Sequence, residues 1–224
     1  MGKPEDMSHI SIIGGHGTVA LHLTRILTAH DDNEVTGVVR NPDHQEDLAK
    51  AGAKMAVVDL ENDTAETLAG AIAGSDAVVF AAGSGPGSGA ERKWTVDRDG
   101  AVKLVEACRI ADVNRYVMVS SMGTDDPPEG DEVFAQYLRA KAEADQALMD
   151  SDLAWTVVRP GGLTDDEPAG TITLDRHVDR GEIPRADVAA VLAAVLATPA
   201  MAGRVVEVVG GKTPVADAIS SHIS

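Results

Sequence analysis

The stretch of sequence that decides the fold is Ile10–Ala20, which reads ISIIGGHGTVA. Its first four residues predict a strand, and Thr18–Leu27 repeats apolar residues at helical spacing. The turn between them has the pattern G-x-x-G-x-x-A. Gly14 permits a tight turn, Gly17 lets a ligand approach the backbone, and Ala20 allows close packing of the helix. This order of strand, glycine turn and helix predicts the first unit of an α/β fold.

The rest of the chain continues this alternation. Several predicted strands, such as Ala77–Phe80, are apolar throughout, which is typical of strands buried on both faces of a parallel sheet. We therefore predict one α/β domain, residues 1–224, with a Rossmann-like doubly wound parallel sheet and helices on both faces. The further predicted strands are Glu34–Val39, Lys54–Val58, Asp76–Phe80, Tyr116–Ser120, Trp155–Val158 and Val205–Val209. The further predicted helices are Pro42–Ala51, Thr64–Ile72, Glu91–Ile110, Phe134–Met149 and Asp187–Leu196, with a terminal turn at Val215–Ile219.

Three glycine-rich loops follow the carboxyl ends of predicted strands. They are Gly83–Gly89, Gly123–Gly130 and Gly161–Gly170. In open α/β sheets, ligands bind at that edge. The segment 161–185 is expected to form a small lid on the substrate side, and Asp187 is expected to cap the helix that follows it.

The glycine turn predicts a dinucleotide site, because unpaired N–H groups at a helix N-terminus attract a pyrophosphate. A glycine-rich turn without a ligand is the alternative, since the pattern alone is weak. His16 either touches the pyrophosphate or fills the turn. The predicted residues on the phosphate side are Gly14, Gly15, His16, Gly17, Thr18 and Val19.

The residues after the second strand bear on the choice of cofactor. An NAD site usually has Asp or Glu there, which binds the ribose 2′-hydroxyl. This chain has Arg40, whose planar fork suits the extra 2′-phosphate of NADP. NADP is therefore the predicted cofactor, with NAD as the alternative. Asp59 ends the third strand and either accepts a hydrogen bond from the adenine amine or caps the next helix.

A candidate catalytic pair lies on the predicted helix from Phe134. Tyr137 and Lys141 are four residues apart and share a helix face. A nearby ammonium stabilises a tyrosinate, so that Tyr137 can exchange a proton with a substrate oxygen. Ser120 and Ser121 end the fifth strand, where a hydroxyl can hold that oxygen. The alternative is an exposed amphipathic helix without a catalytic role.

These motifs and several others extend over nearly the whole chain. They are Gly14–Gly17, Val38–Arg40, Ala81–Gly83, Val96–Gly100, Val119–Ser121, Tyr137–Lys141, Val158–Gly161 and Arg185–Val188. Together they resemble the short-chain dehydrogenase/reductase superfamily. Within it, the chain is most similar to the atypical branch of NmrA-like and NAD(P)-binding proteins, which includes NAD(P)-dependent epimerases and dehydratases.

The resemblance implies a role for each matched residue. The cofactor phosphates would be held by Gly14, Gly17 and Arg40. The adenine would be bordered by Asp59 and Leu60. The ribose beside the nicotinamide would lie over Ala81, Ala82 and Gly83. The nicotinamide end would be bordered by Arg159, Pro160 and Gly161. The active-site serine, tyrosine and lysine would be Ser120 or Ser121, Tyr137 and Lys141. Asp97 matches the usual active-site asparagine, and a carboxylate cannot donate the same hydrogen bonds unless it is protonated.

These observations lead to one expected function and two alternatives. The expected function is an NADP-dependent oxidoreductase that acts on a small carbonyl, quinone or sugar-like substrate, with Tyr137 as the acid/base. The first alternative is a redox sensor that binds NADP without turnover. The second is a nucleotide-sugar epimerase or dehydratase, for which the 64 residues after Pro160 leave limited room.

Composition sets the expected partners and compartment. The formal net charge is −17, which disfavours binding to nucleic acid or to anionic membranes. The only cysteine, Cys108, cannot form an internal disulfide and suits a reducing cytoplasm. The histidines lack zinc-like spacing, so no metal is expected. The partner is expected to be a small-molecule substrate, and the protein a monomer or small homo-oligomer.

Overall fold

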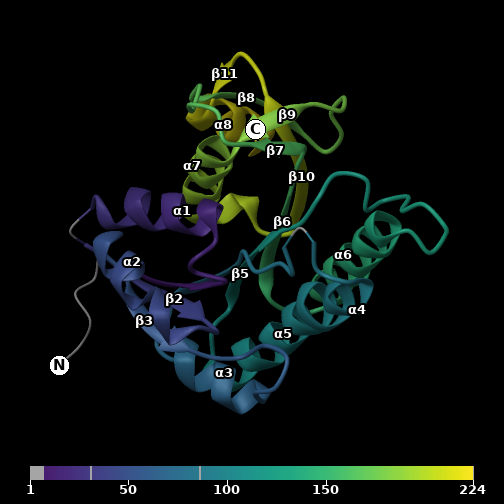
Figure 1. The fold of residues 1–224 in the computed structure, drawn as a ribbon. Helices are drawn as coiled ribbons and strands as arrows, with labels where there is room; N and C mark the ends of the chain where they lie inside the picture. The colour runs from purple at the N-terminus through teal and green to yellow at the C-terminus, as the bar shows by residue number, and fades with distance from the viewer. Residues whose placement is uncertain (1–7, 31, 86, 224) are drawn as a thin grey trace.

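The sheet of the computed structural model has nine strands, in the order β11-β8-β10-β6-β5-β4-β1-β2-β3 (Figure 1). The structure describes residues 8–30, 32–85 and 87–223. The strands of the main sheet are β1 Ser8–Ile13, β2 Asn33–Val39, β3 Lys54–Val57, β4 Ala77–Phe80, β5 Arg115–Val119, β6 Ala154–Pro160, β8 Thr171–Asp175, β10 Arg204–Gly210 and β11 Thr213–Pro214. The helices are α1 Thr18–Thr28, α2 Gln45–Lys50, α3 Ala65–Ile72, α4 Ala90–Arg92, α5 Asp99–Ala111, α6 Val133–Met149, α7 Arg185–Leu196 and α8 Val215–Ile223.

The strand order places a crevice between β1 and β4. β1 pairs in parallel with β2 on one side and with β4 on the other. The chain therefore proceeds outward from β1 to β3 and then returns to β4 to build the other half of the sheet. In such doubly wound sheets, ligands bind outside the carboxyl ends of the strands at this reversal.

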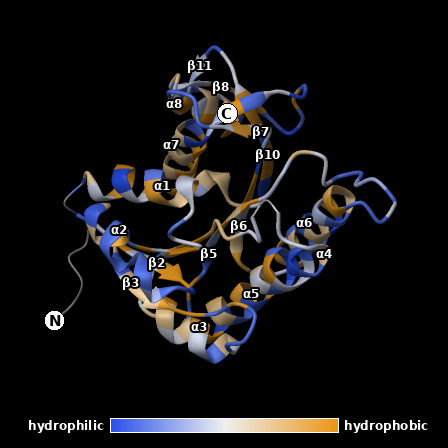
Figure 2. Cartoon of the chain, viewed as in Figure 1, coloured by the Kyte–Doolittle hydropathy of each residue, from blue (hydrophilic) through white to orange (hydrophobic). Residues whose placement is uncertain are grey.

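Two hydrophobic cores lie on opposite faces of the sheet. On one face, Leu23 and Leu27 of α1 pack with Val188 and Leu192 of α7. The other face is covered by α3, α5 and α6, and its core includes Leu104 of α5. Figure 2 shows the strands mostly in the hydrophobic colour and the peripheral loops mostly in the hydrophilic one. The predicted Rossmann-like arrangement, with helices on both faces, is confirmed.

The long helix predicted over Glu91–Ile110 is divided in the structure. α4 is followed by a π-helical turn, Lys93–Arg98, and only then by α5. Single π-helical turns inside helices are frequent at functional sites. Here the turn brings two buried ionisable residues, Lys93 and Asp97, into the interior.

The segment 161–185 contains three strands. β7 Gly162–Thr164 and β9 Glu182–Pro184 form a separate parallel pair, whereas β8 joins the main sheet antiparallel to β10. β8 thus extends the sheet, which the prediction of a lid for this segment did not include. The predicted terminal turn at Val215–Ile219 is also longer, because α8 continues to Ile223.

Two predicted helix starts differ from the structure. α7 begins at Arg185 after Pro184, so Asp187 lies inside the first turn and is not the N-cap. Its buried carboxylate instead accepts hydrogen bonds of 2.9 Å from the amides of Ala169 and Gly170, and thereby anchors the preceding loop. The predicted helix Pro42–Ala51 opens with a 3₁₀ turn, and α2 follows it. In the described part of the chain, no helix is long and apolar enough to cross a membrane.

Candidate active site

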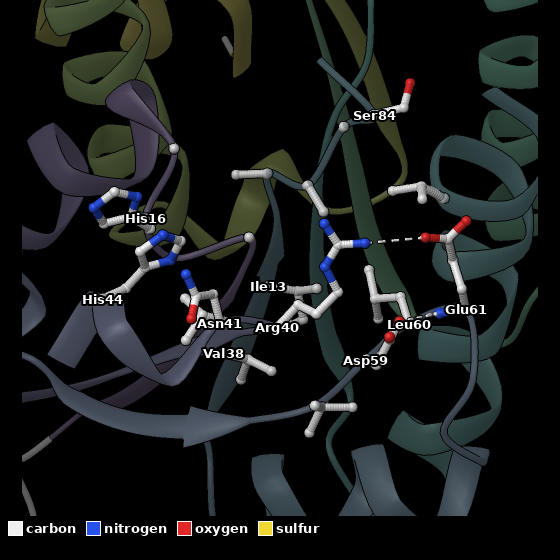
Figure 3. Close-up of a pocket in the computed structure, with 18 of the residues that line it drawn as sticks. Ile13, His16, Val38, Arg40, Asn41, His44, Asp59, Leu60, Glu61 and Ser84 are labelled. Carbon is white, nitrogen blue, oxygen red and sulfur yellow. Dashed lines mark hydrogen bonds and ion pairs between the residues drawn. The ribbon is translucent and has the colours of Figure 1, made fainter. Parts of the chain in front are cut away.

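A cleft of about 510 Å³ opens at the carboxyl ends of β1 to β4, over the crevice (Figure 3). Most of the residues expected to bind a cofactor line it. Those that line it are Gly14, His16, Gly17, Arg40, Asp59, Leu60, Ala81, Ala82 and Gly83. The cleft therefore brings together motifs from four strands.

Two glycines of the turn, Gly14 and Gly17, approach the rest of the cleft without side chains. Gly14 has φ +81°, and a Cβ on it would lie 2.5 Å from Cα of Ala82. A Cβ on Gly17 would meet only the carbonyl oxygen of Gly14 closely, at 3.3 Å. The space above Gly17 is therefore open, at the end of a helix whose first N–H groups have no partner within the helix. These features fit a bound pyrophosphate.

Gly15, Thr18 and Val19 do not line the cleft. A Cβ on Gly15 would lie 2.6 Å from Cα of Gly37, so this glycine allows the turn to pack against β2. Thr18 and Val19 are the first two residues of α1. Their contribution to a phosphate site would come from the backbone, which stays a prediction.

Arg40 lies at the end of β2, as the sequence predicted, but its guanidinium is already paired. Its Nη1 lies 3.3 Å from Glu61 Oε2, and Arg92 Nη2 lies 3.0 Å from the same oxygen (Figure 3 shows the Arg40–Glu61 pair). The hydroxyl of Thr95 donates to Glu61 Oε1 at 2.6 Å. This hydrogen bond, together with Arg92, holds the pKa of Glu61 below its usual range despite partial burial. Two arginines thus converge on one ionised carboxylate at this wall of the cleft.

His16 forms a stack with His44 at the opposite wall. The ring centroids are 3.6 Å apart and the planes differ by 9°. His16 Nε2 also lies 2.9 Å from Asp47 Oδ2, and this hydrogen bond lowers the pKa of Asp47. His16 therefore lines the cleft and braces the turn at the same time.

Asp59 borders the cleft, but its oxygens serve the local turn. Oδ1 accepts from the amide of Glu61 and Oδ2 from the side-chain amide of Asn62, both at 2.9 Å. The bond from Asn62 is the largest cause of a lowered pKa of Asp59. The helix that follows is capped by Thr64, so the proposed capping role of Asp59 is wrong.

A second cavity, of about 290 Å³, lies at the carboxyl ends of β5 and β6. It shares no lining residue with the cleft. It brings together predicted site residues from three separate segments, namely Ser120, Ser121, Tyr137, Pro160 and Gly161. Ser121 and Tyr137 thus border one space at the edge of the sheet that also holds the cleft. Ser120 contributes to the same lining, but its hydroxyl is buried and lies toward the carboxylate of Asp145.

Lys141 does not line this cavity. Its ammonium donates to the carbonyl oxygen of Val119 at 3.0 Å and lies 3.7 Å from Oδ1 of Asp97. Both Lys141 and Asp97 are buried. Oδ2 of Asp97 accepts from the amide and the hydroxyl of Ser84 in the loop after β4. Asp97 therefore accepts hydrogen bonds where an asparagine could also donate, and it neutralises the buried lysine.

Arg159, which the resemblance assigned to the nicotinamide end, lies elsewhere. Its guanidinium is buried and binds Asp145 Oδ2 at 3.0 Å and the carboxylate of Asp125. Only its neighbours Pro160 and Gly161 line the second cavity. Consecutive strand residues face opposite sides of a sheet, which explains the different surroundings.

Several residues that line these spaces were not among the predicted ones. In the cleft they include Asn41, His44, Glu61, Ser84 and Arg92, and in the second cavity Phe134, Leu163 and Arg180. Asn41, Glu61 and Ser84 directly follow predicted residues, and their position after strand ends was an available signal. The others come from helical segments, from β7 and from the loop before β9, whose approach depends on tertiary packing.

One group outside these spaces could offer three metal ligands, namely Asp125, His177 and Glu207. Asp125 is already held by Arg159 and Arg176, which lie on the same carboxylate. Cys108 is buried in the core, and burial raises its pKa to about 12. A thiol in this state is not a nucleophile, so Cys108 serves the packing of the core.

The reversal in strand order, the bare glycine turn and the cleft above it define a dinucleotide-binding Rossmann protein. The chain belongs to the NAD(P)H-binding family, whose model matches residues 14–199. It is 34% identical over 210 residues to a Bacillus subtilis protein named "Uncharacterized sugar epimerase YhfK", over 94% of this chain and 98% of the relative.

Two solved structures extend the comparison. One is from Bacillus halodurans and is described as a "Putative NAD-dependent epimerase/dehydratase". It has a TM-score of 0.89 and 36% identity, and the match covers 96% of this chain and 99% of that one. The other is the oxidoreductase YlbE from Lactococcus lactis, with a TM-score of 0.84 and 29% identity over 95% of both chains. The fold is thus shared over nearly the full length of each.

Proposed function

We propose that this protein is an NADP-dependent oxidoreductase that transfers hydride to or from a carbonyl group of a small substrate. The observation that carries the proposal is the second cavity, in which Tyr137, Ser120 and Ser121 meet. This cavity adjoins β5 and β6, the next strands along the sheet after β4, where the NAD(P)H cleft ends. A dinucleotide that follows the edge of the sheet from the cleft would bring its second nucleoside toward these residues.

The serine and tyrosine side chains of the second cavity have separate roles in the reduction of a carbonyl group. NADPH held in the cleft would supply a hydride for the carbonyl carbon. The hydroxyl of Ser121 donates a hydrogen bond to the carbonyl oxygen and fixes its position, because the hydroxyl of Ser120 is buried beside Asp145. The phenol of Tyr137 gives its proton to that oxygen as the C=O bond becomes CH–OH, and the phenolate regains a proton from water.

The experiment for turnover compares the parent protein with Tyr137→Phe. NADPH consumption is measured by absorbance over a panel of aldehydes, ketones and quinones, and NADPH affinity by fluorescence titration. We expect Tyr137→Phe to lower kcat by about 100-fold or more and to leave NADPH affinity unchanged. Glu143→Gln, on the exposed side of the same helix, is the matched control. Full activity in Tyr137→Phe would remove the tyrosine from the mechanism.

The preference for NADP rests on Arg40 and Arg92. These two guanidinium groups share the carboxylate of Glu61. They lie beside the carboxyl end of β2, where the adenosine ribose of a dinucleotide binds in this fold. A 2′-phosphate would offer both arginines a stronger partner. We expect the parent to prefer NADPH over NADH by about tenfold, or 1.4 kcal/mol, and Arg40→Asp to abolish this preference. Arg25→Asp, on the exposed side of α1, controls for the change in net charge.

A redox sensor without turnover is the second candidate, and the position of Lys141 favours it. Its ammonium is engaged by Val119 and Asp97, and not by the hydroxyl of Tyr137. A sensor would bind NADPH and show no consumption with any acceptor. The epimerase reading is less favoured, because a nucleotide-sugar would have to occupy a cavity little more than half the volume of the NAD(P)H cleft.

A further inference from the structure

The second cavity has a chemical character of its own. Its volume of about 290 Å³ lies just below the range of about 300–1,000 Å³ for small-molecule sites. One wall is formed by Ser120, Ser121 and Tyr137. The remaining walls come from Met122 and the end of β6, from α6, from β7 and from the loop before β9. None of the described residues of these segments lines the cleft. We therefore use the residues of these walls to infer the chemistry of the substrate and not that of the cofactor.

The apolar part of the cavity is unusually exposed. Phe134 is 64% exposed and Leu163 39%, although both are large and hydrophobic. The ring of Phe134 stacks against that of Tyr137, with centroids 6.0 Å apart and planes 29° apart. Met122 and Leu138 complete the apolar lining. A flat apolar ligand would cover this surface, and its ring would lie beside the proton donor.

Among the described residues of the lining, Arg180 is the only charged one. It forms no ion pair or hydrogen bond within the described part of the chain, whereas Arg159, Arg176 and Arg185 each bind a carboxylate. Acidic partners are plentiful, since the chain has 36 acidic residues against 19 basic ones. No acidic residue lines the cavity. A cation left unpaired in so acidic a protein is available for an anion from outside.

We infer that the substrate is a flat aromatic or conjugated carbonyl compound that carries a carboxylate. The ring packs on Phe134 and Leu163, the carbonyl lies at Tyr137 and Ser121, and the carboxylate binds the fork of Arg180. This inference rests on the proposed function, because it assigns the substrate of the same reaction. The reaction keeps the balance given above: the carbonyl gains one hydride and one proton, and NADPH becomes NADP⁺.

The test uses two probes, 4-carboxybenzaldehyde and its methyl ester, in which the ester replaces the negative charge of the carboxylate with a neutral group that is one methyl larger. We expect the parent to reduce the carboxylate with a kcat/KM about tenfold higher than the ester. In Arg180→Gln, this ratio should fall to about one. Arg176→Gln removes a nearby arginine that is bound to Asp125 and should keep the ratio of the parent. Equal rates for both probes in the parent, or a ratio that survives Arg180→Gln, would overturn the inference.

A binding measurement separates this inference from the proposed function. Calorimetric titration of each probe in the presence of NADP⁺ needs no turnover. Suppose that the parent binds the carboxylate probe, that Arg180→Gln does not bind it, and that neither protein consumes NADPH. This result would support the anion site and reject the oxidoreductase. Turnover of the ester alone would support the oxidoreductase and reject the anion site. Phe134→Ser should lower the affinity for both probes equally. An unchanged affinity would show that the ring of Phe134 does not contact the substrate.

Discussion

The ammonium of Lys93 lies over the ring of Tyr137, 5.5 Å from its centroid. Lys93 is buried and comes from the π-helical turn before α5. It also donates to the carbonyl oxygen of Gly85 and to the hydroxyl of Ser88, both at 3.0 Å. The lysine that faces the candidate proton donor is therefore not Lys141. One ammonium links the loop after β4, which borders the cleft, to the helix that carries Tyr137.

Removal of this ammonium should affect the loop and the reaction together. We expect Lys93→Met to lower kcat by about tenfold, because Tyr137 loses a favourable electrostatic contact and the loop loses its attachment. Hydrogen exchange at the amides of Gly85 and Ser88 should become faster. Lys93→Arg keeps the charge and should recover part of both effects, while Lys50→Met, on the exposed side of α2, should change neither. Unchanged exchange in Lys93→Met would mean that the loop is held by other contacts.

The glycine turn allows a separation of folding from ligand binding. A Cβ on Gly15 would lie 2.6 Å from Cα of Gly37, so Gly15→Ala should cost about 1–3 kcal/mol of unfolding free energy. A Cβ on Gly17 meets its nearest atom, the carbonyl oxygen of Gly14, at 3.3 Å, and Gly17 has an ordinary extended φ of −61°. Gly17→Ala should therefore keep most of the stability and place a methyl group where the pyrophosphate binds.

Thermal unfolding and NADPH titration of both variants test this division. We expect Gly17→Ala to raise the Kd for NADPH by about tenfold or more with little change in Tm. Gly15→Ala should lower Tm clearly. If Gly17→Ala binds NADPH as the parent does, the phosphates do not lie over the helix N-terminus.

The features of this structure that could be predicted from the sequence are those with a local sequence pattern. The strand Ala77–Phe80 is apolar throughout and lies at the centre of the sheet, where both faces are covered. β8 reads TITLD, and its alternation is typical of an antiparallel strand with one exposed face. That signal was present in the segment expected to form a lid. The position of Arg40 was predictable from the end of β2, whereas its partner Glu61 belongs to a distant turn and depends on tertiary packing.

The contacts of the candidate catalytic residues also depend on tertiary packing, which the sequence pattern does not show. Spacing on one helix predicted that Lys141 would serve Tyr137, since residues four apart share a face. A shared face leaves the direction of a long side chain open, and the buried carboxylate of Asp97 lies 3.7 Å from this ammonium. Lys93 reaches the tyrosine through a π-helical turn, for which the sequence has no periodic signature. The role of Lys141 in the reaction stays a prediction.

Glu61 should lower the affinity for NADPH, because its carboxylate binds the two arginines that are proposed to bind the 2′-phosphate. Its pKa is lowered first by the hydrogen bond from Thr95 and then by Arg92, so it stays ionised at neutral pH. In Glu61→Gln we expect the ratio of NADPH to NADH affinity to rise by about fivefold, roughly 1 kcal/mol. Fluorescence titrations at pH 7 measure it, and Glu66→Gln in the first turn of α3 is the control. A fall in the ratio would show that Glu61 orients the arginines productively.

The buried pair of Asp145 and Arg159 should control stability in a pH-dependent way. Burial raises the pKa of Asp145 above its ordinary value, although Arg159 partly opposes the shift. Between the unfolded and the folded pKa, the native state binds more protons than the unfolded state. The contribution of Asp145 to stability is therefore most favourable below its unfolded pKa and declines as the pH rises through the folded pKa.

Arg159→Met removes the cation and leaves the carboxylate buried without its ion-pair partner, with only the weaker electrostatic influence of Lys141 remaining. We expect a loss of about 3–5 kcal/mol in unfolding free energy at pH 7, measured by urea denaturation. The loss should shrink as the pH is lowered from 7 toward 4.5, because protonation of Asp145 relieves the buried charge. Asp145→Asn combined with Arg159→Met contains no buried charge at this site, so it should be more stable than Arg159→Met and lose the pH dependence. If both variants are equally unstable at every pH, Arg159 acts through its packing and its bond to Asp125, and not through the charge of Asp145.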